Sequence, residues 1–180
     1  MKKELFKEIE IPENVEIEID ESIIKIKGPQ GMIERHFNIR DLEFKKENGK
    51  IIIGHKKSSK KEKKDMNSIA AHIKNMIKGV QNKFEYKLKI CFSHFPFTLE
   101  IKGNEASIKN FLGEKVPRRI KIPIGAEIKM DKEMITISSV DKELVGRIAA
   151  DLERITKVRN RDRRVFQDGI YLVSRNGEEI

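Results

Sequence analysis

The sequence predicts an α+β fold made of two tandem, duplicated domains, each a small antiparallel sheet with one helix packed on a face. Three observations predict this fold: an internal repeat, one amphipathic helix after each copy of the repeat, and strand-like alternation in the other apolar segments. The boundary is expected near Gln81 and Asn82. It separates an N-terminal domain of residues 1–82 from a C-terminal domain of residues 83–180.

The repeat aligns residues 8–28 with residues 119–139 without a gap. Each copy has the pattern of a short strand, a proline-marked bend and a tight hairpin, with the turns expected at Asp20-Glu21 and Asp131-Lys132. Chance similarity between two strands rich in Ile, Lys and Glu is the alternative, but the matched proline and turn aspartate favour a duplication. The identical pairs are Ile9/Ile120, Ile11/Ile122, Pro12/Pro123, Glu16/Glu127, Ile17/Ile128, Asp20/Asp131, Ile24/Ile135 and Ile26/Ile137.

One amphipathic helix follows each copy. Ser59 and Glu62 form a capping-box pattern at the start of the first helix, and Gly79 is expected to end it. Asp141 is a suitable N-cap for the second helix. The apolar stripes at 3.6-residue spacing are Met66, Ile69, Ala70, Ile73, Ile77 and Val80 in the first helix, and Leu144, Ile148, Leu152 and Ile155 in the second.

The remaining apolar runs are expected to form strands, and Cys91 within one of them is expected to be a small core side chain. These runs are Met32–Phe37, Ile51–Ile53, Phe84–Phe92, Phe97–Ile101 and Ile108–Leu112. Seven phenylalanines lie in or beside strand-like runs, so core packing is expected for them rather than stacking on bases: Phe6, Phe37, Phe44, Phe84, Phe92, Phe97 and Phe111.

Composition excludes several classes of protein. One cysteine in 180 residues leaves no intrachain disulfide and no CxxC zinc site. No run approaches the roughly 20 apolar residues of a membrane span, and the N-terminus lacks the apolar segment of a signal peptide. A soluble, intracellular protein with no membrane partner is therefore expected. The net charge of +9 favours a polyanionic partner, above all nucleic acid, over a merely solvated basic surface.

No pattern indicates catalysis or a cofactor. Gly28-Pro29-Gln30-Gly31 matches the GXXG clamp of KH domains, but it lies between two strand-like segments and is better explained as a β-turn. The histidines lack metal-ligand spacing, and His72 lies at the edge of an apolar stripe, as a structural histidine does. These residues are His36, His55, His72 and His94. We therefore expect that the protein is not an enzyme and that it has no cofactor and no metal site.

Two basic clusters remain as candidate sites. The first, residues 56–64, surrounds the start of the first helix, where cations oppose the helix dipole; phosphate contact and a solvated lysine loop are equally good explanations there. The second, residues 157–164, follows the second helix directly and is rich in arginine, which suits bidentate phosphate contacts. We expect this second cluster to contact RNA, with Asp162 holding one of its arginines in place.

The segment RNRDRRVFQDGIYLV at residues 159–173 resembles the C-terminal signature of the large-subunit ribosomal protein L-six family, in its archaeal and eukaryotic form. Three other segments resemble parts of the same family: HIKNMIKGV at residues 72–80, FSHFP at residues 92–96 and NFLGEKVPRR at residues 110–119. The resemblance extends from about Ile9 to Val173, and the long C-terminal segment is highly specific.

The resemblance implies a structural constituent of the large ribosomal subunit with two similar α+β domains. It implies binding to large-subunit rRNA, mainly through the C-terminal domain, near the elongation-factor site and its sarcin-ricin loop. Neighbouring large-subunit proteins would be further partners, and no homo-oligomer is expected. The rRNA contacts implied are Lys157, Arg159, Asn160, Arg161, Arg163 and Arg164, with Lys115, Arg118 and Arg119 as weaker candidates. A free-standing RNA-binding factor is the alternative.

Overall fold

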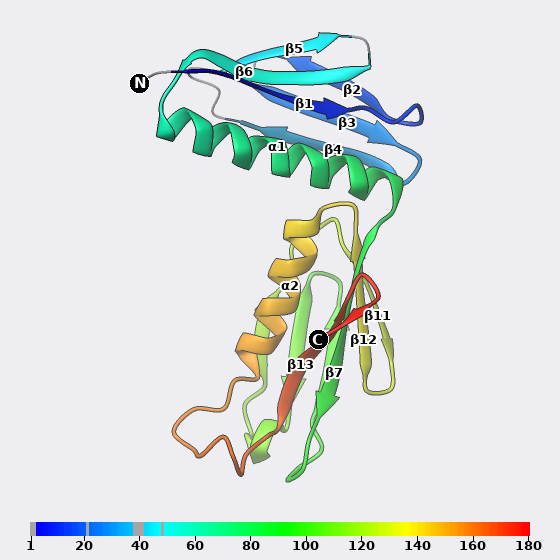
Figure 1. Cartoon of the computed structure of the whole chain (residues 1–180). Helices are drawn as coiled ribbons and strands as arrows, with labels where there is room; N and C mark the ends of the chain where they lie inside the picture. The colour runs from blue at the N-terminus through cyan, green and yellow to red at the C-terminus, as the bar shows by residue number, and fades with distance from the viewer. Residues whose placement is uncertain (1–2, 21, 38–41, 48) are drawn as a thin grey trace. The chain divides into compact units, whose positions relative to one another are not determined.

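A computed structural model of the chain describes residues 3–20, 22–37, 42–47 and 49–180. The chain divides into two compact units, Met1–Lys83 and Phe84–Ile180 (Figure 1). In the described residues each unit combines one long helix with antiparallel strands, which confirms the predicted α+β class. Among these described residues each unit has two sheets rather than the single sheet expected.

The first unit places its helix against strands of two three-stranded antiparallel sheets, ordered β1-β6-β5 and β2-β3-β4. Isoleucines from both sheets and from the helix form its core, and Ile26, Ile53 and Ile73 are fully buried. The elements are β1 (Lys3–Glu10), β2 (Glu16–Asp20), β3 (Ile23–Gly28), β4 (Gly31–His36), β5 (Glu43–Glu47), β6 (Lys50–Ser58) and α1 (Lys60–Gln81).

Helix α1 begins as predicted and ends later than predicted. The Ser59 hydroxyl accepts from the Lys61 N–H, and the Glu62 carboxylate accepts from the Ser59 N–H at 2.7 Å. The hydrogen bond from the Ser59 side chain lowers the pKa of Glu62 to about 2. The prediction that Gly79 ends the helix is wrong. The Asn82 N–H still donates to the Lys78 carbonyl at 2.8 Å, because the helical ladder continues past this buried glycine.

The Gly28–Gly31 segment is a turn between β3 and β4, as predicted, and it packs on the end of α1. The Gln30 N–H donates to the Val80 carbonyl at 2.9 Å. A Cβ atom on Gly28 would lie 2.9 Å from the Cβ, Cγ2 and carbonyl oxygen of Val80. Glycine is therefore needed here for close approach of the hairpin to the helix.

We expect Gly28→Ala to lower the free energy of unfolding of the first unit by about 1–3 kcal/mol, because the added methyl group overpacks against helix backbone. Gly146→Ala is the matched control: a Cβ there meets nothing closer than 3.9 Å, and removing a helical glycine should stabilise by about 0.5–1 kcal/mol. Chemical denaturation of both variants measures the two effects. Equal effects of the same sign would contradict the packing described for Gly28.

The second unit pairs its helix with a five-stranded antiparallel sheet, ordered β11-β12-β7-β13-β14, and contains a second sheet ordered β10-β9-β8. Its core includes Leu88, Ile135 and Leu152. The elements are β7 (Phe84–Cys91), β8 (Thr98–Lys102), β9 (Glu105–Lys109), a 3₁₀ turn (Phe111–Gly113), β10 (Arg118–Lys121), β11 (Glu127–Asp131), β12 (Met134–Ser139), α2 (Lys142–Ile155), β13 (Gly169–Arg175) and β14 (Glu178–Glu179).

The internal repeat has a structural counterpart. Strands β2 and β3 correspond position for position to β11 and β12, and the pair Glu16–Lys27 has its equivalent in the pair Glu127–Ser138. The turn at Lys132 has a left-handed backbone (φ 52°), while Glu21 of the other copy lies outside the described residues. The strand that pairs with the other edge of each hairpin differs in its position in the chain. Strand β4 follows the β2–β3 hairpin, whereas β7 precedes the β11–β12 hairpin.

The expected strand at Ile108–Leu112 is only partly correct. Strand β9 ends at Lys109, because Asn110 adopts a left-handed backbone (φ 59°) and its side-chain amide donates to the Pro96 carbonyl at 2.9 Å. The chain then turns into the 3₁₀ segment and buries Phe111. Helix α2 begins at the predicted cap, since the Asp141 carboxylate accepts from the Glu143 N–H at 2.9 Å.

Some side chains expected in the core lie nearer the surface. Phe6 is 44% exposed, because its ring covers Gly54 on the paired strand, and Phe92 is 42% exposed just beyond the end of β7. Cys91 is only half-buried at the end of that strand. On α2 the buried face includes Ile148 and Leu152 as expected, but it is completed by Val145 and Ala149, with Leu144 and Ile155 at its edges.

Within the described residues, none of the helices has the length and apolar character needed to cross a membrane. The same part of the chain contains no group of three or more His, Cys, Asp or Glu side chains placed to hold a metal ion.

Candidate nucleic-acid interface

The arginine loop, residues 157–164, lies between α2 and β13 in the second unit (Figure 1). Its polar and cationic side chains are exposed, and among the described residues no carboxylate pairs with Arg159, Arg161 or Arg163. The sequence-predicted contacts that the structure places together here are Lys157, Arg159, Asn160, Arg161, Arg163 and Arg164.

The start of the arginine loop is held by hydrogen bonds between the end of α2 and strand β13. The buried Thr156 hydroxyl donates to helix carbonyls and accepts from the Ile170 N–H at 3.0 Å. One turn earlier, the Glu153 carboxylate accepts from the Leu172 N–H at 2.9 Å, beside the register shift between Leu172 and Ser174. These bonds fix the position from which the loop leaves the helix.

Contacts made by residues of the arginine loop, among themselves and with neighbouring side chains, hold the shape of the loop. Val158 is buried in the core, and the Arg161 guanidinium lies over the Phe166 ring, 4.7 Å from its centre. Asp162 accepts from the Arg164 backbone N–H at 3.0 Å and from its guanidinium at 2.9 Å. This confirms the expected role of Asp162 in holding an arginine. The hydrogen bonds lower the pKa of Asp162 and raise that of Arg164.

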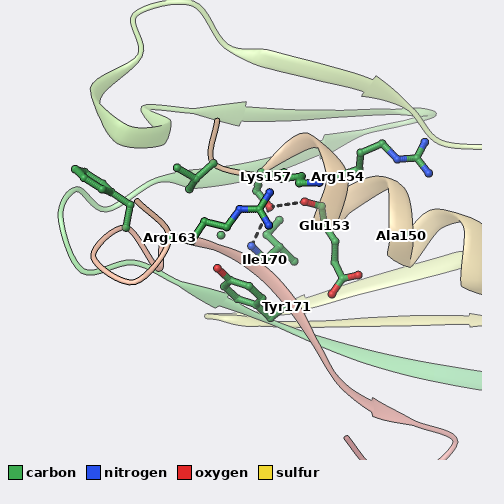
Figure 2. A pocket seen from close by; sticks show the side chains of 11 residues that line it. Ala150, Glu153, Arg154, Lys157, Arg163, Ile170 and Tyr171 are labelled. Atoms are coloured by element: carbon green, nitrogen blue, oxygen red, sulfur yellow. Dashed lines mark hydrogen bonds between the residues drawn. The ribbon is translucent and has the colours of Figure 1, made fainter. Parts of the chain in front are cut away.

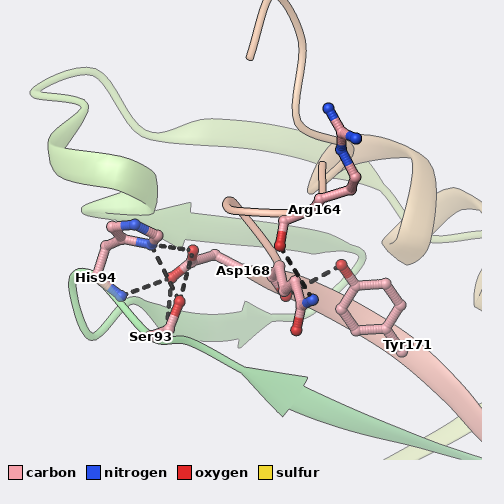
Figure 3. Close-up of polar contacts among 6 residues, drawn as sticks. Ser93, His94, Arg164, Asp168 and Tyr171 are labelled. Carbon is pink, nitrogen blue, oxygen red and sulfur yellow. Dashed lines mark hydrogen bonds and ion pairs between the residues drawn. The ribbon is translucent and has the colours of Figure 1, made fainter. Parts of the chain in front are cut away.

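Asp168, which follows the arginine loop and has a buried side chain, holds the C-terminal end of the loop in place (Figure 3). Its carboxylate accepts from the backbone N–H groups of Ser93 at 2.8 Å and His94 at 3.1 Å. The His94 Nδ1 atom lies 2.7 Å from the same carboxylate, and the imidazole stacks on Phe166 with ring centres 4.5 Å apart. The segment FSHFP therefore contacts Phe166 and Asp168, which follow the arginine loop, and holds the C-terminal end of the loop in place.

Electrostatics keep Asp168 ionised. Burial raises the pKa of its carboxyl, but hydrogen bonds from the His94 and Ser93 backbones outweigh burial and hold it at about 2. An ionised carboxylate can only accept, so the facing Nδ1 atom of His94 carries the proton. The result is a charge-assisted contact between two segments far apart in the sequence.

The Ser93, His94 and Asp168 group has the residue types of a hydrolase triad but not its geometry. The Ser93 hydroxyl lies 3.1 Å from Nδ1 of His94, the same nitrogen that faces Asp168. In a triad, serine and aspartate lie on opposite ring nitrogens, so that the imidazole can move a proton between them. This group is therefore a structural fastening and not a catalytic site.

The weaker candidates divide into two kinds. Lys115 and Arg119 are exposed. Arg118 instead donates from Nε to the Glu114 carboxylate at 2.7 Å, donates to the Ile155 carbonyl, and lies over the Phe111 ring at 4.4 Å. Arg118 thus joins β10 to the end of α2, and this packing favours a role in supporting the arginine loop over direct contact.

The basic cluster at residues 56–64 fits both a phosphate contact and a solvated lysine loop. The side chains of residues 56–58 lie outside the described set, whereas Lys60, Lys61 and Lys63 are exposed. The ionised Glu62 in the capping box already places one negative charge at the helix start. A solvated surface and a phosphate contact both remain compatible with this arrangement.

The residues that hold the loop in place could not be identified from sequence patterns alone. Asp168 and His94 are 74 positions apart, and neither shows a motif spacing. Their only signal was membership of the two family-like segments at residues 92–96 and 159–173.

Comparisons with known proteins agree with this architecture. A family model described as ribosomal protein L6 matches residues 11–83 and 95–169, one stretch in each unit. A large ribosomal subunit protein uL6 from Staphylothermus marinus is 46% identical over 180 residues, covering 97% of both chains. Its counterpart from Methanococcus vannielii is 42% identical over 173 residues, covering 96% of this chain and 95% of the relative.

A third relative of the same name, from Methanothrix thermoacetophila, is 39% identical over 175 residues, covering 97% of this chain and 99% of the relative. The family match overlaps both copies of the repeat, and the relatives extend over nearly the full length of the chain. The chain belongs to the ribosomal protein L6 family.

Proposed function

We propose that the protein is a non-enzymatic, structural constituent of the large ribosomal subunit and that it binds large-subunit rRNA mainly through the second unit. The observation that carries the proposal is the arginine loop. Its exposed cations lie in a segment that hydrogen bonds hold at both ends, those of Thr156 at the N-terminal end and those of Asp168 at the C-terminal end. Rigid, cationic loops suit recognition of folded RNA by its backbone shape.

The family resemblance supports a position near the elongation-factor region and its sarcin-ricin loop, with other large-subunit proteins as neighbours in a cytoplasmic, ribosome-bound protein. Lys115 and Arg119 are proposed as additional phosphate contacts because both are exposed on the segment that Arg118 joins to α2. Chemical probing of the sarcin-ricin loop with and without the bound protein tests this placement.

Sedimentation of a cell lysate through sucrose gradients at low and high salt tests the proposed function. We expect the chain to sediment with the large subunit and to remain there in moderate salt, since about six phosphate contacts would hold it. Recovery only in the free soluble pool would contradict the proposal and would instead support a free-standing RNA-binding factor.

A further inference from the structure

A cavity of about 400 Å³ opens beneath the arginine loop, between the last turns of α2 and the start of β13 (Figure 2). Its volume falls in the range of small-ligand pockets, roughly 300–1,000 Å³. Apolar groups of Ala150, Val158 and Ile170 line it, and Val158 and Ile170 are buried. The mechanical anchoring of the loop described above does not require such a space.

The cavity also presents an aromatic face and several charges. Tyr171 is 45% exposed; its ring packs on Gly169 and its hydroxyl donates to the Gln167 carbonyl at 3.1 Å, so the ring is held in one orientation. Arg154, Lys157 and Arg163 contribute cations to the lining, and Glu153 contributes a carboxylate (Figure 2).

This combination fits one nucleotide. Bases splayed out of folded RNA stack on aromatic rings and arginine planes, while cations contact the phosphates beside them. One oxygen of the Glu153 carboxylate accepts from the Leu172 N–H, and the other can accept from a base that carries an exocyclic amino group. Arg154 is paired with Asp151 at 3.3 Å, which leaves the cations of Lys157 and Arg163 for an anionic ligand.

We propose that this cavity receives one nucleotide extruded from large-subunit rRNA, with its base on Tyr171. The inference rests on the proposed function and adds a specific contact to it. The adjacent phosphates lie on Lys157 and Arg163, and the base is adenine, guanine or cytosine. Stacking on an aromatic ring accounts for about a 5- to 150-fold gain in affinity.

Ala150→Leu tests the proposal because it fills the cavity from an exposed helix position, where leucine is readily accommodated. Ala71→Leu, at an exposed position of α1 outside this cavity, is the matched control. Full-length variants are bound to deproteinised large-subunit rRNA, and base accessibility is mapped with dimethyl sulfate and kethoxal. We expect one base protected by the wild-type protein to become reactive with Ala150→Leu, and affinity to fall about 5- to 150-fold.

The outcomes separate this inference from the proposed function. Equal affinity and equal base protection with the wild-type protein and Ala150→Leu would overturn the inference while leaving rRNA binding intact. Failure of the wild-type protein to bind rRNA would overturn the proposed function. Tyr171→Ala, which removes the ring, should resemble Ala150→Leu.

Adenosine monophosphate and guanosine monophosphate, added alone, distinguish rRNA from a free nucleotide as the source of the ligand. We expect neither to displace the bound rRNA, because a mononucleotide lacks the contacts of the surrounding loop. Submicromolar binding of either one, with no base of rRNA protected, would contradict the proposal and identify a free-nucleotide site.

Discussion

Replacing Arg159, Arg161 and Arg163 together by glutamine is expected to weaken binding to large-subunit rRNA by about 1,000-fold at 0.1 M salt. Each exposed arginine is proposed to contact phosphate, and a hydrogen bond to a charged group contributes about 1.5–3 kcal/mol, or at least about tenfold in affinity. The slope of log affinity against log salt should also become shallower by about 2–3, because fewer counterions are released. Filter binding across a salt series measures both quantities.

A control variant removes the same charge elsewhere in the second unit. Lys102, Lys121 and Lys129 are exposed on strands outside the arginine loop. Their joint replacement by glutamine should lower affinity only through the smaller net charge, with a change well below that of the arginine variant. Equal losses in the two variants would show that net charge, and not the arginine loop, governs binding. Arg164 is left unchanged because it pairs with Asp162.

Asp168→Ala is expected to give the largest loss of stability among substitutions around the site. Two backbone N–H groups, of Ser93 and His94, would lose their acceptor, and each such loss costs about 1–3 kcal/mol. We expect the free energy of unfolding of the second unit to fall by about 2–6 kcal/mol. rRNA affinity should fall as well, since the C-terminal end of the arginine loop is released. Denaturation and filter binding on the same preparation measure the two effects.

The same carboxylate predicts a dependence of stability on pH. Its pKa is about 2 in the folded protein and 3.8 ordinarily, so the stabilisation is present above about pH 4 and is lost as the pH falls towards 2. The pKa difference corresponds to about 2 kcal/mol. Asp168→Asn keeps an oxygen acceptor but does not titrate. Wild type and Asp168→Asn should therefore converge in stability between pH 4 and 2, and parallel curves would contradict the assignment.

The local features of the fold could be predicted because nearby residues determine them. The capping box at Ser59 and Glu62, the N-cap at Asp141 and the turn at Gly28–Gly31 each depend on side chains within a few positions. The duplicated hairpins were visible because alternation and turn residues recur in register. Glycine at position 79 misled the prediction, because burial against the sheets kept the helix intact through it.

The supporting contacts of the site could not be predicted in this way. Asp168 meets His94 only because strands β7 and β13 pair and bring the segments beyond them together. The cavity beside Tyr171 lies between α2 and β13, which meet only through tertiary packing, and such packing leaves no periodic signal in the sequence. The cations of the arginine loop were found because they are adjacent in the chain.

Arginine-selective modification with phenylglyoxal tests the central claim, that the arginine loop is the rRNA-binding surface, most directly. The free chain and the chain within purified large subunits are modified in parallel, and each arginine is quantified by mass spectrometry. We predict that Arg159, Arg161 and Arg163 react in the free protein and are protected in the subunit. Equal reactivity of these three side chains in both states, or protection confined to the first unit at Arg35, would contradict the account.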